Sequence, residues 1–246
     1  MVIESKSNKL ISHIKKLQTK KYSQLYNECV IENEKIIFER INDITTILIN
    51  NDYASKYDKL LQNFTGNIYY ISKQICEDLS QASNPSAIYA IYKLTNKNNY
   101  ENSNFLVLDN LQDPNNVGAI IRSARAFGYN KIYAINSVYP YLYKTIRSSM
   151  GYIFDVDFES ISKDKFIELA IKKDFKILCA DMEGKDISSY SNNFNRFGIC
   201  IGNEGNGVSD ELVKICFETV AIPMQNNVES LNASVSAGIL MFNLKK

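Results

Sequence analysis

The chain has 246 residues, 45% of them hydrophobic, and a formal net charge of +1 at pH 7. This length supports one large domain or two modest ones with a real core, and the balanced charge argues against a polycation that binds nucleic acid along its whole length. No apolar run is long enough to span a membrane, so we expect a soluble, cytoplasmic protein. A single histidine, His13, and five dispersed cysteines without a CxxC pair argue against hydrolase triads, disulfides and metal sites.

The N-terminal part of the chain predicts a small α/β domain over residues 1–93. Apolar residues recur at helical spacing from Leu10 to Leu17 and predict a helix over residues 5–19. Short β-type runs at residues 44–49, 67–71 and 86–92 then alternate with helical runs at residues 33–41, 55–63 and 72–80. The first 21 residues hold six lysines, which form either a basic patch for RNA or an ordinary solvated helix face.

An asparagine-rich linker at residues 94–103 leads into a strict alternation of strands and helices over residues 104–246. Strands are predicted at residues 105–108, 131–135, 152–158, 175–180, 198–201 and 220–222. Helices are predicted at residues 117–127, 141–149, 162–172, 209–215 and 230–244. The pattern favours an α/β fold with a mostly parallel six-stranded sheet covered by helices on both faces.

The first polar motif, Asp113-Pro114-Asn115-Asn116-Val117-Gly118, lies at a strand-to-helix turn. An asparagine is expected to cap the helix, and Pro114 to fix the turn. Arg122 follows in a helix whose other positions are mostly apolar or small, so we expect it to need a partner. Arg125 lies on an adjacent face and could share that partner.

The second motif, Gly202-Asn203-Glu204-Gly205-Asn206-Gly207, invites a nucleotide-binding interpretation. Its glycines read GxxGxG after the fifth strand, whereas a dinucleotide fingerprint reads GxGxxG after the first strand. A P-loop is also absent from the sequence. A tight turn is the local structural alternative, but Glu204 between glycines is accessible to a closely approaching ligand.

The third motif begins with Ile222-Pro223-Met224 at the end of the last strand, and Ser230-Leu231-Asn232 then opens a helix of small residues. Small residues indicate close packing against another helix for most of its length. Ser230 and Asn232, at the start of the helix, are candidates for polar contacts.

In this order and spacing the three motifs resemble the SpoU/TrmH branch of the SPOUT methyltransferases, which methylate the ribose 2′-hydroxyl of RNA with S-adenosylmethionine. The resemblance implies a C-terminal trefoil knot and a homodimer that completes the substrate site across its interface. It places the methyl donor against backbone groups of Gly202, Ile222 and Leu231. The family's active-site positions fall on Asn116, Arg122, Glu204, Ser230 and Asn232.

The resemblance also implies roles and a substrate. A guanidinium resists deprotonation, so we interpret Arg122 as a phosphate fork that orients the ribose and stabilises alkoxide charge. Asn226 stands where the family usually has glycine. The segment Ile31-Glu32-Asn33-Glu34 is similar to part of the family's ribosomal-protein-like RNA-binding domain, which favours 23S ribosomal RNA. Transfer RNA as substrate, and a catalytically silent RNA-binding or ribosome-assembly protein, remain alternatives, whereas an oxidoreductase lacks its fingerprint.

Overall fold

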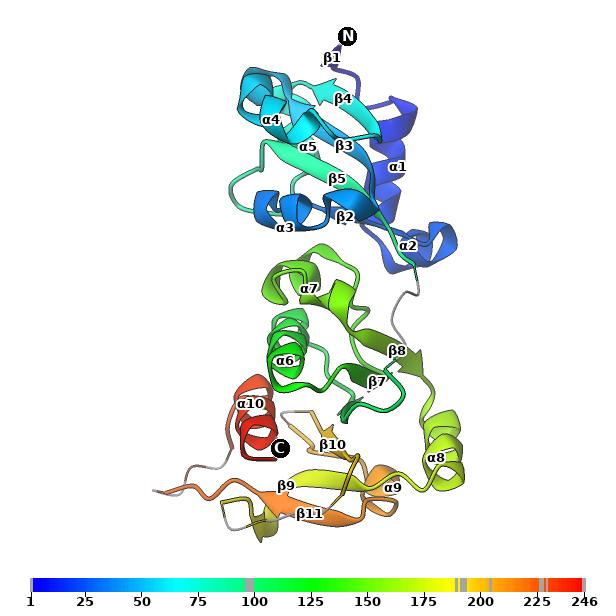
Figure 1. Ribbon diagram of the computed structural model, residues 1–246, viewed down its shortest axis with the longest axis vertical. Helices are drawn as coiled ribbons and strands as arrows, with labels where there is room; N and C mark the ends of the chain where they lie inside the picture. Colours follow the sequence, from blue (N-terminus) through cyan, green and yellow to red (C-terminus); the bar gives the residue numbers. More distant parts are fainter. Residues whose placement is uncertain are drawn as a thin grey trace. The chain divides into compact units, whose positions relative to one another are not determined.

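The structure is a computed structural model that describes residues 2–95, 100–188, 190, 194–203, 205–225, 228 and 230–244. The chain divides into two compact units (Figure 1). Unit 1 comprises Met1–Asn96 with Tyr141–Arg147, and unit 2 comprises Lys97–Pro140 with Ser148–Lys246. No helix in the described part of the chain has both the length and the apolar character that crossing a membrane requires.

Unit 1 is built on a mixed five-stranded sheet in the order β1-β4-β3-β5-β2. Its strands are β1 (Val2–Ile3), β2 (Glu28–Ile31), β3 (Ile44–Asn50), β4 (Asn67–Ile71) and β5 (Ile88–Lys93). Its helices are α1 (Lys9–Leu17), α2 (Lys20–Tyr26), α3 (Glu34–Glu39), α4 (Asp58–Leu61) and α5 (Lys73–Leu79), with 3-10 turns η1 (Ile41–Asp43) and η2 (Asn51–Tyr57). β3 pairs parallel with β4 and antiparallel with β5.

The core of unit 1 explains where its lysines point. Ile11, Ile14 and Leu17 of α1 are buried against the sheet, together with Ile75 and Leu79 of α5. Because these apolar residues recur every three or four positions, the lysines between them are turned away from the core. The amphipathic pattern therefore fixes α1 on the sheet by its apolar face.

Unit 2 contains the predicted six-stranded sheet, and every strand pairing in it is parallel, in the order β11-β9-β10-β6-β7-β8. The strands are β6 (Phe105–Asp109), β7 (Lys131–Ile135), β8 (Asp157–Ile161), β9 (Ile177–Asp186), β10 (Gly198–Ile201) and β11 (Glu218–Ala221). The helices are α6 (Pro114–Phe127), α8 (Lys163–Lys172), α9 (Asp210–Val213) and α10 (Ala233–Leu244), with the turn η3 (Tyr152–Asp155). Helix α7 (Tyr143–Ser148) begins in the segment that groups with unit 1.

Helices cover both faces of this sheet, as predicted. α6 and α10 lie together on one face, and α8 and α9 lie on the other (Figure 1). Phe166 of α8 and Leu212 of α9 pack with Phe105 and Val107 of β6 in one apolar cluster. Strand β6 is buried along its whole length, as expected of a parallel strand between two helical layers. The trefoil knot stays a prediction.

The strand order places a switch point at the centre of the sheet. The chain runs from β6 outward to β7 and β8, then crosses to β9 on the far side and returns to β10 next to β6. Open α/β sheets bind ligands at the carboxyl ends of the strands beside such a switch. The first motif follows β6 and the glycine motif follows β10, so both reach this point.

One predicted strand is wrong in its first half. Residues 152–155 form the 3-10 turn η3, and the strand β8 begins only at Asp157. Gly151, with φ +79°, starts the turn, which buries Ile153 and leaves Tyr152 exposed. The apolar run Tyr152-Ile153-Phe154 therefore packs as a turn, since periodicity alone does not separate a short strand from a short turn.

The edge strand β8 is attached to β7 by a small ion network. Lys131, at the start of β7, is buried, and its Nζ donates hydrogen bonds to Asp157 Oδ2 at 2.8 Å and to Glu159 Oε2 at 2.6 Å. Both carboxylates belong to β8, two residues apart, and therefore share one face of the strand. The network compensates the desolvation of the buried ammonium.

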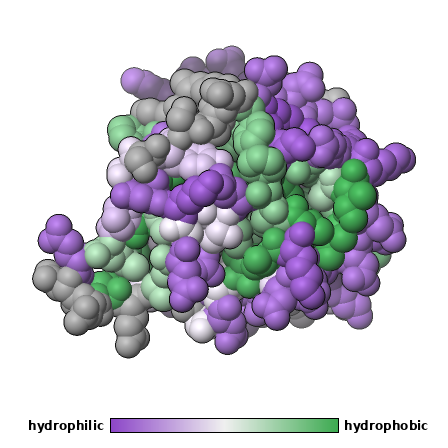
Figure 2. Space-filling model, turned by 90° about the horizontal axis from the view of Figure 1, so that it is seen from below, coloured by the Kyte–Doolittle hydropathy of each residue, from purple (hydrophilic) through white to green (hydrophobic). Residues whose placement is uncertain are grey.

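Some large apolar side chains remain exposed on unit 2. Figure 2 shows one face of the molecule, on which apolar surface (green) is surrounded by hydrophilic surface (purple). The most exposed large apolar side chains described in unit 2 are Ile171 on α8, Met182 on β9, Phe217 before β11, Val228, and Val235 and Phe242 on α10. Two of them, Val235 and Phe242, lie on one helix, α10.

Candidate functional site

Helix α6 starts differently from the sequence prediction. Its N-cap is Asp113, whose Oδ1 accepts a hydrogen bond from the backbone N–H of Asn115 at 2.9 Å, and Pro114 is the first helical residue. An asparagine was expected to cap this helix, so that expectation is wrong. The aspartate takes the role because it directly precedes Pro114, which suits the first helical position. Asn116 is thereby left for another contact.

Asn116 and Asn232 link the first and third motifs. Asn116 is buried in the first turn of α6, and its Oδ1 accepts a hydrogen bond from Nδ2 of Asn232 at 3.0 Å. Asn232 also caps α10, because its Oδ1 accepts hydrogen bonds from the backbone N–H and the hydroxyl of Ser234. One side chain therefore caps a helix with its oxygen and fixes a second helix with its nitrogen.

Arg122 lies on the exposed side of α6, so the apolar residues around it in the sequence do not surround it in the fold. The apolar neighbours in sequence, Val117, Ile120 and Ile121, occupy the opposite, buried side of the helix. Arg122 comes six residues after Asn116, which corresponds to about 120° of rotation around the helix axis. The guanidinium and the buried amide thus leave α6 in different directions.

The glycine motif folds into a closed turn. Asn203 and Gly207 exchange two backbone hydrogen bonds, of 3.1 and 2.9 Å, and the side-chain oxygen of Asn203 accepts one from the N–H of Gly205 at 2.7 Å. A Cβ atom at Gly202 would lie 2.0 Å from the carbonyl carbon of Gly207. Gly202 is therefore required by the turn itself, whose last glycine has φ +64°.

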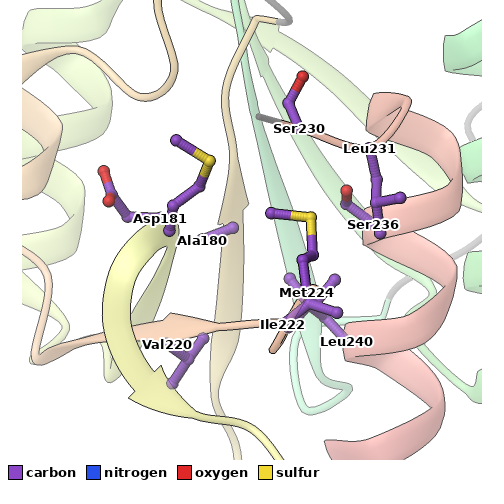
Figure 3. Close-up of a pocket in the computed structure, with 10 residues that line it drawn as sticks. Ala180, Asp181, Val220, Ile222, Met224, Ser230, Leu231, Ser236 and Leu240 are labelled. Carbon is purple, nitrogen blue, oxygen red and sulfur yellow. The ribbon is translucent and has the colours of Figure 1, made fainter. Parts of the chain in front are cut away.

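Two adjoining cavities open beside this turn. The smaller, of about 110 Å³, is shown in Figure 3. Ala180 and Asp181 of β9 approach it from one side and Leu231 and Ser236 from the other, with Met224 between them (Figure 3). Its further lining residues are Met182, Val220, Ile222, Ser230 and Leu240. Most of these side chains are apolar, so this apolar cavity suits an apolar group.

The second cavity, of about 440 Å³, is more polar because the glycine turn forms one of its walls. Gly202, Asn203, Gly205, Asn206 and Gly207 contribute to it. It shares six lining residues with the apolar cavity: Ala180, Asp181, Met182, Ser230, Leu231 and Ser236. Small-molecule sites have volumes of roughly 300–1,000 Å³, so this loop cavity is large enough for a ligand.

The predicted donor-binding residues therefore lie around one region. Ile222 and Leu231 line the apolar cavity, and Gly202 and Leu231 line the loop cavity. Ser230 is exposed and lines both. That these residues bind a methyl donor or act in catalysis stays a prediction. Glu204 and Asn226 lie outside the described residues.

Sequence reasoning missed Asp181. It is the one carboxylate among the described residues that line the two cavities. Its Oδ1 accepts a hydrogen bond from the backbone N–H of Glu183 at 2.9 Å, which leaves Oδ2 available to a ligand. The signal was present, because a charged residue directly follows a buried strand segment at a sheet edge where α/β proteins bind ligands.

The cysteines near the site are unsuited to nucleophilic chemistry. Cys179 and Cys200 are buried in the strands that carry the site, and all five cysteines of the chain are free thiols. A hydrogen bond with Cys216 and burial raise the pKa of Cys179. A thiol in that state remains protonated and unreactive at neutral pH.

The comparisons with known proteins agree with this architecture. Residues 103–242 match the family model described as the SpoU rRNA Methylase family. The chain is 25% identical to the 23S rRNA (guanosine(2553)-2'-O)-methyltransferase RlmP of Bacillus subtilis (strain 168), over 99% of this chain and 98% of that relative.

Solved structures share the whole fold. An AdoMet-bound rRNA methyltransferase from Sinorhizobium meliloti superposes with a TM-score of 0.84 at 20% identity, over 99% of this chain and 96% of that chain. The SpoU methyltransferase AviRb from Streptomyces viridochromogenes, in complex with AdoMet, gives a TM-score of 0.82 at 19% identity, over 96% of this chain and 97% of that chain. The family model spans more than half of the chain, and so the family predicted from the three motifs is confirmed: this protein is a member of the SpoU rRNA methylase family.

Proposed function

We propose that the protein transfers a methyl group from S-adenosylmethionine to a ribose 2′-hydroxyl of RNA, and that its substrate is 23S ribosomal RNA. The hydrogen bond between Asn116 and Asn232 carries this proposal. It joins the first and third motifs beside cavities whose walls include the glycine turn of the second. Three segments far apart in the sequence thus build one site at the switch point of the sheet.

The two cavities suit the two halves of the donor. Adenine is flat and largely apolar, and the apolar cavity offers Ile222, Leu231 and Leu240. The methionine part is zwitterionic and polar, and the loop cavity offers backbone groups of the glycine turn together with Asp181. When bound, the donor would supply an electrophilic methyl carbon on a positively charged sulfur. The residues of the chain would then have to position the ribose oxygen.

Arg122 is proposed to bind and orient the RNA. Its guanidinium can donate two hydrogen bonds to one phosphate, which fixes the attached ribose. Its positive charge stabilises the negative charge that develops on the 2′-oxygen as the new carbon–oxygen bond forms. The hydroxyl proton passes to a phosphate oxygen or to water. Asn116 and Asn232 hold the start of α10, and with it Ser230 and Leu231, in place.

We further propose that the enzyme is a homodimer through unit 2. α10 is apolar nearly all around, and a helix of this kind is normally buried. Val235 and Phe242 on α10 are nevertheless 49% and 54% exposed, and the ring of Phe242 contacts Phe127 of α6. A second copy placed on α6 and α10 would cover them. Since Arg122 projects from α6 away from Asn116, such a dimer could present it to the partner's cavity.

The proposal of ribosomal RNA as the substrate rests on a relative that matches the whole length of the chain. The RlmP relative, named for a 23S ribosomal RNA nucleotide, matches both units of this chain. We assign recognition of the RNA to residues 1–93, including the lysine-rich α1, and the methyl transfer to residues 104–246. A ribosomal RNA substrate places the enzyme in the cytoplasm. The segment of residues 94–103 then acts as the linker.

Mapping 2′-O-methyl groups tests the proposal. Ribosomal and transfer RNA from cells that lack the protein should miss one modification, in 23S RNA, which returns with the wild-type chain but not with Arg122→Ala. A modification that disappears from transfer RNA would contradict the substrate assignment. If no site changes, and calorimetry detects no binding of S-adenosylmethionine, the protein is the silent RNA-binding alternative.

A further inference from the structure

Lysine and tyrosine side chains gather on α1 and α2 of unit 1. This surface, which we call the α2 surface, consists of Lys16, Lys20, Lys21, Tyr22, Leu25 and Tyr26. Leu25 is 64% exposed and Tyr26 is 43% exposed. The apolar residues that α1 needs for packing lie on its other face, so these exposed side chains are not required by the core of unit 1.

Five of the six lysines of the N-terminal segment fall into two groups. Lys6 and Lys15 form ion pairs with the carboxylate of Asp78, so their charge is locally balanced. Within the described residues, Lys16, Lys20 and Lys21 have no carboxylate partner. The Nζ atoms of Lys16 and Lys21 lie 5.6 and 5.5 Å from the ring centre of Tyr22. Two of these uncompensated charges therefore lie beside one aromatic ring.

The aromatic rings are themselves ordered. Tyr22 and Tyr26 are one helical turn apart, and their rings are nearly parallel, with 14° between their planes and 6.3 Å between their centres. The rings of His13 and Tyr26 meet at 73°, with 4.9 Å between their centres, and His13 Nε2 is hydrogen-bonded to Glu28 Oε2 at 2.7 Å. These contacts hold Tyr26 in one orientation while leaving much of its ring exposed. Glu28 is hydrogen-bonded to His13, which contacts this cluster through Tyr26.

We propose that the α2 surface binds a single-stranded segment of the RNA substrate, with bases against Tyr22 and Tyr26 and phosphates against Lys16, Lys20 and Lys21. Aromatic rings beside cations are how proteins hold single strands, because every unpaired base offers a stacking face. A duplex keeps its bases stacked inside and would use only the lysines. The inference deepens the proposed function and rests on RNA being the substrate of this enzyme.

The experiment measures binding of the full-length protein to a fluorescent 15-nucleotide oligouridylate, without methyl donor. Removing Tyr26 by Tyr26→Leu should weaken binding roughly 5- to 150-fold, the range for loss of one stacked base. Tyr26→Phe keeps the ring and should bind like the wild type. The double variant Lys16→Ala/Lys21→Ala should lower the slope of log K against log salt by about 1.4, that is about 0.7 per lost phosphate.

Lys6→Ala is the matched control, because Lys6 is exposed on the same segment but paired with Asp78. It should leave both affinity and salt slope unchanged, and thermal melting should show all variants folded. The inference is wrong if Lys6→Ala weakens binding as much as the double variant, if Tyr26→Leu has no effect, or if anionic vesicles bind in place of the oligonucleotide. Since no donor is present, loss of methyl transfer alone would overturn the proposed function and leave this surface standing.

Discussion

Nδ2 of Asn232 donates a hydrogen bond to Oδ1 of Asn116 at 3.0 Å, across 116 positions of the chain. Because Asn232 also caps α10 with Oδ1, its two roles can be separated. Asn232→Asp keeps a capping oxygen and loses the donor, so we expect a stable protein with strongly reduced methyl transfer. Asn232→Ala loses both and should also cost about 1 kcal/mol of unfolding free energy. Urea denaturation measures the capping role and a methyl-transfer assay measures the role of the donated hydrogen bond. Equal stability of both variants would contradict the capping role.

Arg122→Lys should retain RNA binding but lose most of its turnover, because an ammonium cannot make the two-pronged phosphate contact. Near-normal turnover would refute the proposed fork.

If the dimer presents Arg122 to the partner's cavity, mixing inactive Arg122→Ala with inactive Asn232→Ala should restore activity, since mixed dimers contain one complete site. Mixtures that stay inactive would assign each arginine to its own subunit.

Asp181→Asn should weaken binding of S-adenosylmethionine about fivefold, because an attraction of about 1 kcal/mol to the cationic sulfur is lost at an exposed site. S-adenosylhomocysteine lacks that charge and should be less affected. Asp186 is a matched control, because it lies on the same strand and accepts the same type of bond, from the N–H of Ser188, yet lines neither cavity. Calorimetry with both ligands should find Asp186→Asn unchanged; an equal effect would refute a specific role for Asp181.

Gly202→Ala should disrupt the glycine turn, since the new Cβ would lie 2.0 Å from the carbonyl carbon of Gly207. Overpacking of this kind costs on the order of 1–3 kcal/mol, and the shifted turn should also weaken donor binding. In Gly205→Ala the nearest atom is the side-chain oxygen of Asn203, at 3.3 Å, so the turn should survive. Thermal melting and titration with the methyl donor compare the two variants. Equal melting temperatures and equal donor affinities would contradict the packing argument.

Phe242→Asp should convert the proposed dimer into a monomer, because it places a charge on the apolar side of α10 that a second copy would bury. Sedimentation equilibrium measures the mass directly. Ile171→Asp on α8 introduces the same charge at a side chain that is 68% exposed, and should leave the mass unchanged. A wild-type chain that sediments as a monomer would rule out the dimer at once.

Buried strands were the most predictable part of the fold. The ranges of β7 and β10 agree with the sequence, because continuous apolar runs between turn residues have few alternatives. Short elements were missed: β1, with two residues, β2, with four, and α2, whose tyrosines and lysines carry no apolar periodicity. The turn at Tyr152–Asp155 was mistaken for a strand, since the left-handed backbone at Gly151 decides it.

The site was predictable in its segments and less so in its contacts. The motifs at Asn116, Gly202 and Asn232 indicated which parts of the chain to expect near one another, because residues after parallel strands meet at one edge. The exposure of Arg122 did not follow from its neighbours in sequence. It depends on which side of α6 is covered by α10 and the sheet. Asp181 could be recognised as a candidate only from the lining of the two cavities.

The ion network of Lys131 also concerns the open edge of the sheet. Strand β8 is an edge strand, and such strands can recruit strands of other molecules and start aggregation. The carboxylates of Asp157 and Glu159 would have to be buried if a foreign strand paired there, and their hydration resists this. The two carboxylates that compensate the buried Lys131 therefore also resist pairing of this edge with another molecule. Replacing both of them would reduce solubility before it reduced activity.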